Sequence, residues 1–277
     1  MGGICQAHQG VSQRFVCAAL GWSRTSVRFR AAASPVDTAR ERLAKLALEH
    51  PSWGYRRLWV VLKRQCPKLG RRRFRRLYAE LRLQRKRNPR RRPTPRRTPA
   101  ALPRATEARQ SYAFDFMHHV TTCNIGFRVL VVVDEFTREL LALRVARSFT
   151  SRSTTQVLAD VFAEYGTPQQ VRCDNGPEFV SKTTANWLRS QHVHVLYSRP
   201  AKPCDNGLCE STNGKIRDEL LGPNLFATIT LAAEAADAYR HHYNEVRPHS
   251  ALRNLTPNQF YATLQPAETV VQPGPEM

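Results

Sequence analysis

The spacing of apolar residues separates an early part of the chain with helical periodicity from a later part with strand-like periodicity. Between residues 11 and 85, apolar side chains recur every three or four positions, as on one face of a helix. Ser12 and Ser23 would each cap a short helix, and Gly21 would end the first of them. This arrangement is typical of a helix-turn-helix.

Three longer amphipathic helices are expected next. The apolar positions from Val36 to Ala47 stop before Pro51, because proline cannot continue a helix. A second helix opens at Gly54 and a third follows the turn at Gly70, and both carry basic residues beside an apolar face. Such helices suit contact with a DNA groove. The residues expected to bind nucleic acid here are Arg56, Arg57, Arg71, Arg72, Arg73, Arg75 and Arg76.

Residues 88–104 contain five prolines, many arginines and no apolar period. We interpret this segment as an extended cationic linker that lies along a phosphate backbone through Arg90, Arg91 and Arg92. A purely spacing role is the alternative. The linker would follow a helical DNA-binding region at residues 1–87.

Beyond the linker, runs with a period of two predict strands. Three strands are followed by alternating helices and strands, which indicates an α/β layer fold. The expected strands are residues 112–119, 127–135, 140–146, 170–173 and 193–197, and the expected helices are 154–165, 181–190, 207–221 and 228–243. The catalytic core would span residues 105–222, and residues 223–277 would complete it with a C-terminal helix and tail.

The net charge of +21 is concentrated in the first part of the chain. Residues 1–110 hold 28 Lys and Arg against 5 Asp and Glu, a balance of +23, whereas residues 111–277 hold 15 against 17, a balance of −2. Charge at this density favours a polyanionic partner over a merely solvated basic surface. No apolar run is long enough to cross a membrane, so we expect nucleic acid rather than lipid.

The N-terminus lacks the pattern of a signal peptide, and the seven cysteines have no C-x-x-C pair. Their odd number suits reduced thiols, so we expect a cytoplasmic protein, in association with the nucleic acid that its charge would bind. The spacing of Cys204 and Cys209 gives only weak support to a zinc site, since no second Cys/His pair follows.

Three acidic residues form the candidate catalytic set. Asp115 lies inside an apolar strand, where an unpaired carboxylate is costly, and Asp174 ends a later strand. Each alone is as compatible with an ordinary structural role. Asp134 competes with them, but its context is more typical of a hairpin-turn acid. The discriminating feature is the spacing, with 58 residues between Asp115 and Asp174 and 35 more before Glu210.

The motifs around these acids resemble the bacterial insertion-sequence transposases of the OrfB type, which have a retroviral-integrase-like DDE core. The resemblance extends over nearly the whole chain and includes the upstream basic helices. The matching stretches are HPSWGYRRL at 50–58, RRLYAELRLQRKR at 75–87, DFM at 115–117, VLVVVDEFTREL at 129–140, VRCDNGPEF at 171–179, KPCDNGLCESTNGKIRDELL at 202–221 and YNEVRPHSALRNLTPNQF at 243–260.

The resemblance implies a ribonuclease-H-like fold, an α/β fold with a mixed five-stranded sheet and flanking helices. In such a fold Asp115 lies on the first strand, Asp174 follows the fourth, and Glu210 faces both from a helix. Converging carboxylates repel unless cations neutralise them, and hard oxygen ligands suit two Mg²⁺ or Mn²⁺ ions. The implied activity is a DNA transposase that cuts element ends and joins their 3′ hydroxyls to DNA.

Further residues could contact DNA near the acids. Asn213 and Arg217 follow Glu210 on nearly the same helical face, and both are expected to bind nucleic acid. Lys215 falls on another side of the helix. Arg247 and His249 could either contact DNA or cap the last helix, and the sequence does not decide between these roles.

The expected partners are double-stranded DNA, further copies of the chain, and the upstream OrfA product or a fusion with it. OrfA supplies a leucine zipper in this family, and no sustained heptad repeat occurs in this sequence. Tyr112 and Arg253 stand where the family usually has tryptophan and glycine. The alternatives are a hydrolytic nuclease of the same fold, and a DNA-binding regulator or inactive remnant.

Overall fold

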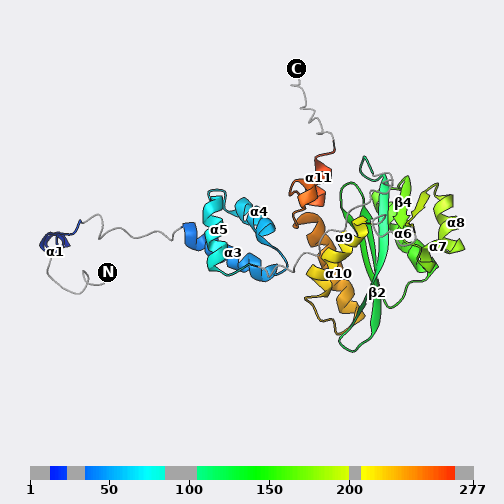
Figure 1. Cartoon of the computed structure of the whole chain (residues 1–277), viewed down its shortest axis with the longest axis horizontal. Helices are drawn as coiled ribbons and strands as arrows, with labels where there is room; N and C mark the ends of the chain where they lie inside the picture. Colours follow the sequence, from blue (N-terminus) through cyan, green and yellow to red (C-terminus); the bar gives the residue numbers. More distant parts are fainter. Residues whose placement is uncertain (1–12, 24–34, 85–104, 200–206, 266–277) are drawn as a thin grey trace, which may run out of the picture. The chain divides into compact units, whose positions relative to one another are not determined.

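The computed structural model describes residues 13–23, 35–84, 105–199 and 207–265. The chain forms two compact units, residues 1–84 and residues 85–277 (Figure 1). The second short helix expected after Ser23 and the linker arginines Arg90, Arg91 and Arg92 lie outside the described residues.

The first unit is helical. Its helices are α1 (Gln13–Ala19), α3 (Pro35–Glu49), α4 (Tyr55–Gln65) and α5 (Arg71–Glu80). The last three share an apolar cluster centred on Leu43, Leu62 and Phe74, none of which is exposed. This agrees with the helices expected before Pro51, after Gly54 and after the turn at Gly70.

The second unit is built on one sheet with the strand order β3-β2-β1-β4-β5. The strands are β1 (Ser111–Val120), β2 (Gly126–Asp134), β3 (Leu140–Ala146), β4 (Gln170–Cys173) and β5 (His194–Tyr197). The first three form an antiparallel meander, and β4 and β5 continue the sheet in parallel from β1. This mixed five-stranded sheet is the ribonuclease-H-like topology that the sequence predicted.

Helices cover both faces of the sheet (Figure 1). One apolar cluster joins it to α6 (Ser151–Tyr165), α7 (Pro177–Val180) and α8 (Lys182–Ser190). The other joins it to α9 (Gly207–Ile216), to the π-helical turn η2 (Arg217–Leu221) and to α10 (Ile229–Glu245). A short 3₁₀ turn, η3 (Ser250–Leu252), and α11 (Pro257–Ala262) follow. Because strand side chains alternate between faces, Phe114 enters the first cluster and Met117 the second.

The structure differs from the sequence-based expectations at several boundaries. Helix α6 begins at Ser151, earlier than expected, because Thr150 and Ser153 form a capping box. The single helix expected over residues 207–221 changes to π geometry at Arg217, and Gly222 closes the turn by donating its N–H to the Arg217 carbonyl at 2.8 Å. The sequence did not predict α7 or α11.

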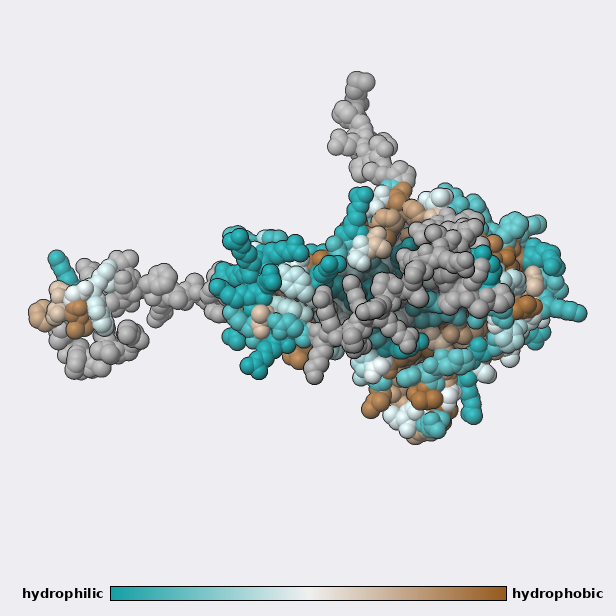
Figure 2. Space-filling model, viewed as in Figure 1, coloured by the Kyte–Doolittle hydropathy of each residue, from teal (hydrophilic) through white to brown (hydrophobic). Residues whose placement is uncertain are grey.

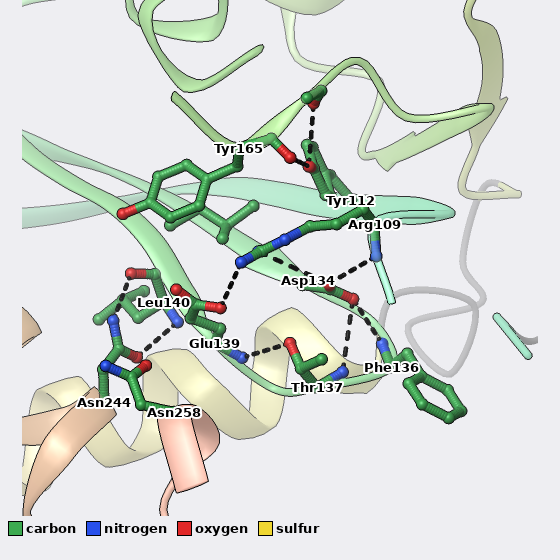
Figure 3. Close-up of polar contacts among 12 residues, drawn as sticks. Arg109, Tyr112, Asp134, Phe136, Thr137, Glu139, Leu140, Tyr165, Asn244 and Asn258 are labelled. Atoms are coloured by element: carbon green, nitrogen blue, oxygen red, sulfur yellow. Dashed lines mark hydrogen bonds and ion pairs between the residues drawn. The ribbon is translucent and has the colours of Figure 1, made fainter. Parts of the chain in front are cut away.

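The edge strand β3 is tied to α10 by a buried asparagine. The Asn244 side chain accepts the N–H of Leu140 at 2.8 Å and donates to the Leu140 carbonyl at 3.0 Å (Figure 3). Asn244 is 5% exposed, so water does not replace these bonds readily. The pair of bonds fixes where the last large helix lies against the sheet.

Replacing Asn244 with alanine is therefore expected to lower the free energy of unfolding by about 2–4 kcal/mol, because both polar groups of Leu140 would lose a buried partner. Urea denaturation monitored by circular dichroism measures the change. Asn258→Ala is the matched control, since Asn258 makes only a 3.4 Å contact with Glu245 at an exposed position. Its effect should stay within about 0.5 kcal/mol. Equal losses of stability in both variants would contradict the role of Asn244.

Candidate active site

The pairing of β1 with β4 brings two of the predicted acids to neighbouring positions. Ala113 is paired with Arg172 in parallel register, and Asp115 and Asp174 each follow two residues later. Adjacent strands lie about 4.8 Å apart. The parallel register therefore carries the two carboxylates to the same level of the sheet.

Asp174 is held by the turn that follows β4. Its Oδ1 accepts the N–H of Gly176 at 3.0 Å. A Cβ atom on residue 176 would lie 3.0 Å from the same oxygen, closer than side-chain carbons normally approach. A larger residue at position 176 would therefore crowd the Asp174 side chain, and the bond from the Gly176 N–H orients this exposed carboxylate.

Helix α9 contributes the third acid through its contact with β1. The Asn213 side chain donates its amide hydrogen to Asp115 Oδ2 at 2.8 Å, and the backbone N–H of Phe116 donates to Asp115 Oδ1 at 2.8 Å. Glu210 precedes Asn213 by three residues and therefore lies on the same side of α9. Its side chain is exposed, whereas Asn213 is 8% exposed.

The three carboxylates influence one another electrostatically. Burial raises the pKa of Asp115 to about 6, and the negative charges of Asp174 and Glu210 add to this rise. The hydrogen bonds from Phe116 and Asn213 act in the opposite direction. Ionised Asp115 is therefore unfavourable where it stands, and a cation beside it would relieve the repulsion.

Oxygen donors from three carboxylates match the preference of Mg²⁺ or Mn²⁺, so these side chains fit such ions chemically. In the part of the chain that the structure describes, no three Asp, Glu, His or Cys side chains are grouped closely enough to hold a metal as they stand. Asp115 and Asp174 follow neighbouring positions of the sheet, and the helix that carries Glu210 contacts β1 through the bond from Asn213 to Asp115.

The other sequence candidates have distinct positions. Arg217 is exposed at the start of η2, and Lys215 Nζ lies 5.9 Å from the centre of the Tyr243 ring. Asn213 was expected to bind nucleic acid, but the contact that its amide makes is with Asp115. Arg56 is exposed and Arg57 is half-buried on α4, and the five candidate arginines of α5 are all exposed.

Arg247 and His249 lie inside the protein. The sequence left open whether they contact DNA, and their burial argues against that role. Arg247 is 1% exposed and forms two hydrogen bonds with Glu219, at 2.6 and 2.7 Å. His249 is 4% exposed, and its Nε2 lies 3.4 Å from the Tyr243 carbonyl. The sequence analysis did not identify Glu219 as the partner of Arg247. The one sequence feature that suggests an inward-facing position is its spacing of three residues from the apolar Ile216.

Asp134 is confirmed as a turn acid. It is fully buried at the end of β2, where its carboxylate accepts the backbone N–H groups of Arg109 at 2.9 Å and Phe136 at 2.8 Å (Figure 3). The Arg109 side chain continues to Glu139 at 2.7 Å. Asp134 is thus occupied in joining the start of the core to the β2–β3 turn.

Comparisons with known proteins agree with the fold. An HTH-like domain family matches residues 36–92, and two integrase core domain families match residues 105–203 and 191–257. A chain of the simian T-cell lymphotropic virus intasome, solved in complex with a PP2A regulatory subunit, aligns with a TM-score of 0.52 and 22% identity. That alignment covers 66% of this chain and 64% of the viral chain, and it shows the fold alone.

Proteins of bacterial insertion elements are similar over most of the chain. An uncharacterised IS407 protein of Burkholderia multivorans is 34% identical, covering 91% of each chain. An uncharacterised IS476 protein of Xanthomonas euvesicatoria is 33% identical, covering 92% of this chain and 74% of the relative. Transposase InsD of the Escherichia coli element IS2 is 27% identical, covering 76% of this chain and 74% of InsD. The chain therefore belongs to the insertion-sequence transposases that have an integrase core.

None of the helices described here is long and apolar enough to cross a membrane.

The raised pKa of Asp115 predicts that Asp115→Asn stabilises the metal-free protein above pH 6. The folded-state pKa of about 6 exceeds the ordinary value of 3.8, so the ionised form destabilises the fold. This cost is absent below about pH 4, grows as the pH rises towards 6, and is then constant. At pH 8 the free energy of unfolding should rise by roughly 1–3 kcal/mol. Partial solvation of the carboxylate makes this smaller than the full pKa shift would give.

Urea denaturation in a chelating buffer between pH 4 and pH 8 measures this gain. Asp237→Asn serves as the control, because Asp237 forms only an exposed ion pair with Arg144. A gain for Asp115→Asn that does not change with pH would contradict the electrostatic explanation.

Proposed function

We propose that this chain is the catalytic subunit of a transposase, a metal-dependent polynucleotidyl transferase in which Asp115, Asp174 and Glu210 form the reaction centre. The observation that supports the proposal most directly is the placement of the elements that carry these acids: parallel register puts Asp115 and Asp174 at neighbouring positions, and the Asn213–Asp115 bond joins the helix of Glu210 to β1. The membership of the chain in a transposase family supports the same reaction class.

The three carboxylates would together hold two divalent ions, Mg²⁺ or Mn²⁺. When bound, Mg²⁺ or Mn²⁺ would supply Lewis-acid activation of the attacking hydroxyl and charge neutralisation at the leaving oxygen. The protein's own contribution is to fix the carboxylates before DNA arrives. Phe116 and Asn213 orient Asp115, and Gly176 orients Asp174.

The proposed reaction has two phosphoryl-transfer steps. In the first, water attacks the phosphorus at the element end, and the bond between phosphorus and the 3′ oxygen of the element breaks. The freed 3′ hydroxyl then attacks a second phosphodiester, forming one phosphorus–oxygen bond and breaking another. Neither step requires a protein nucleophile, which agrees with a site made of carboxylates.

Asp174→Asn and Glu210→Gln are each expected to lower Mg²⁺-dependent joining at least about a thousandfold, because ligands that act as a unit cannot substitute for one another. DNA binding should survive. Labelled element ends that already have a free 3′ hydroxyl, incubated with plasmid, measure joining, and labelled ends that continue into flanking DNA measure cleavage. Asp237→Asn is the matched carboxamide control.

The same assay distinguishes the alternatives. Hydrolysis without joined product would identify a nuclease of this fold, and binding without any metal-dependent product would identify a regulator or remnant. Wild-type joining by either variant would contradict the assigned residues. Joining that requires an added OrfA segment would support the proposed partner, and joining of paired ends would support an oligomer.

The first unit is proposed to bind double-stranded DNA through α5. Phe74, Leu77 and Tyr78 turn one face of α5 into the apolar cluster, which leaves the arginines on the solvent side. The face of the α3–α5 unit seen in Figure 2 is mostly hydrophilic. Exposed arginines gathered on one helix are well suited to phosphate contacts.

The double variant Arg72→Ala/Arg75→Ala should weaken DNA binding and reduce the slope of log K against log salt by about two, because each arginine is expected to neutralise one phosphate. Fluorescence anisotropy over a salt series measures the slope. Arg152→Ala/Arg189→Ala is the charge-matched control, since both arginines are exposed on α6 and α8 of the other unit. An equal change in both double variants would show that only net charge matters.

A further inference from the structure

The helix that carries Glu210 is anchored at its far end by a buried ion pair. Glu219 in η2 accepts two hydrogen bonds from Arg247, from Nε at 2.7 Å and from Nη2 at 2.6 Å. The two side chains are 7% and 1% exposed. The Tyr239 hydroxyl adds a third bond to Glu219 at 3.2 Å. A bidentate pair with this geometry fixes direction as well as distance.

The partner arginine comes from a distant part of the sequence. Glu219 and Arg247 are separated by 28 residues, and α10 lies between them in the chain. Tyr239 and Tyr243 of α10 pack with Ile216 in the same apolar cluster. The Arg247 guanidinium also lies 5.4 Å from the centre of the Tyr243 ring. The C-terminal segment therefore holds the end of the α9–η2 helix.

The position of Glu210 depends on how this helix is seated. The Glu210 side chain is exposed, while Cys209, Asn213 and Ile216 of the same helix are buried. The position of the α9 backbone therefore determines where the Glu210 side chain lies. One contact at the Asn213 level and one at the Glu219 level fix both the rotation and the axial position of the helix.

The π turn connects the two contacts. Glu219 follows Ile216 by three residues and therefore faces the protein interior. Gly222 closes the turn, and a Cβ atom at that position would lie 2.9 Å from the Arg217 carbonyl oxygen. π turns are rare and mark places where the helix register is adjusted. Here the π turn contains Glu219 itself, so the helix register is adjusted at the point where Arg247 holds the helix.

We propose that Glu219 and Arg247 are positioning residues that seat α9 so that Glu210 reaches Asp115 and Asp174. The role of Glu210 rests on the proposed function, whereas the seating of α9 does not. Breaking the pair would loosen α9 and weaken divalent-ion binding at the three carboxylates, without removing any DNA contact.

The first test measures the seating of α9 without metal or DNA. Hydrogen–deuterium exchange of the full chain should show exchange in residues 207–216 roughly tenfold faster or more in Glu219→Gln, as expected when a charge-assisted bond is removed. Glu139→Gln is the matched control, because Glu139 forms another buried ion pair, with Arg109 at 2.7 Å, away from α9. It should leave exchange in α9 unchanged.

The second test measures the Mg²⁺ concentration that gives half-maximal joining. Glu219→Gln and Arg247→Lys should raise it about tenfold, while the dissociation constant for DNA stays unchanged. A purely structural loss would reduce the active fraction without changing the Mg²⁺ dependence, and Glu139→Gln should behave in this way. If the charge variants do not fold, Tyr239→Phe replaces them in this test. It removes only the hydroxyl bond to Glu219 and should raise the half-maximal Mg²⁺ concentration by a smaller factor.

The two tests separate the inference from the proposed function. Wild-type protein without any metal-dependent product would overturn the proposed function, and exchange in α9 would still report whether the pair seats the helix. Wild-type joining with unchanged Mg²⁺ dependence in folded Glu219→Gln would overturn the positioning role. Faster exchange in α9 with unchanged Mg²⁺ dependence would overturn it as well, because the pair would then only stabilise the helix.

Discussion

The mutual repulsion of three carboxylates is the constraint that the integrase-core unit must accommodate. Asp115 is the most constrained of them, because it lies on a central strand where burial already raises its pKa to about 6. Its position is nevertheless fixed by two hydrogen bonds, one from the next peptide group and one from Asn213. Regular backbone elements therefore determine where Asp115 lies. A rigid scaffold of this kind holds side chains in positions that electrostatic repulsion would otherwise disfavour.

Buried and partly buried arginines provide much of the remaining polar structure of this unit. Each of them joins parts that are distant in sequence: Arg109 with Glu139, Arg128 with Glu178, Arg172 with Glu135, and Arg247 with Glu219. Removing either partner would leave an uncompensated charge in the interior, so these pairs specify one arrangement of the elements. Arginines thus have opposite uses in the two units. The candidate arginines of α5 are all exposed, whereas Arg172 and Arg247 of the second unit are buried and paired with Glu135 and Glu219.

The sequence predicted the sheet well because its signals are local. The alternation in residues 112–119 and the apolar run in 127–135 each identify a strand without knowledge of its partner. The spacing of Asp115, Asp174 and Glu210 could be compared with a family pattern. The Glu219–Arg247 pair could not be predicted, because nothing local distinguishes a buried ion pair from a surface acid and a DNA-binding arginine. Helix α7, of 4 residues, was missed because periodicity cannot be recognised over so short a stretch.

The C-terminal segment belongs to the core as much as the sheet does. Helix α10 and the residues just after it make two separate connections. Asn244 contacts the edge strand β3, and Arg247 contacts Glu219 in η2, which continues the helix that carries Glu210. Helix α10 also contributes Ala236, Tyr239 and Tyr243 to the apolar cluster that includes Ile216 of α9. A displacement of α10 would therefore be transmitted both to β3 and to α9. Since β3 pairs with β2 and β2 with β1, the edge of the sheet and the Glu210 helix are held in one frame with the strand of Asp115.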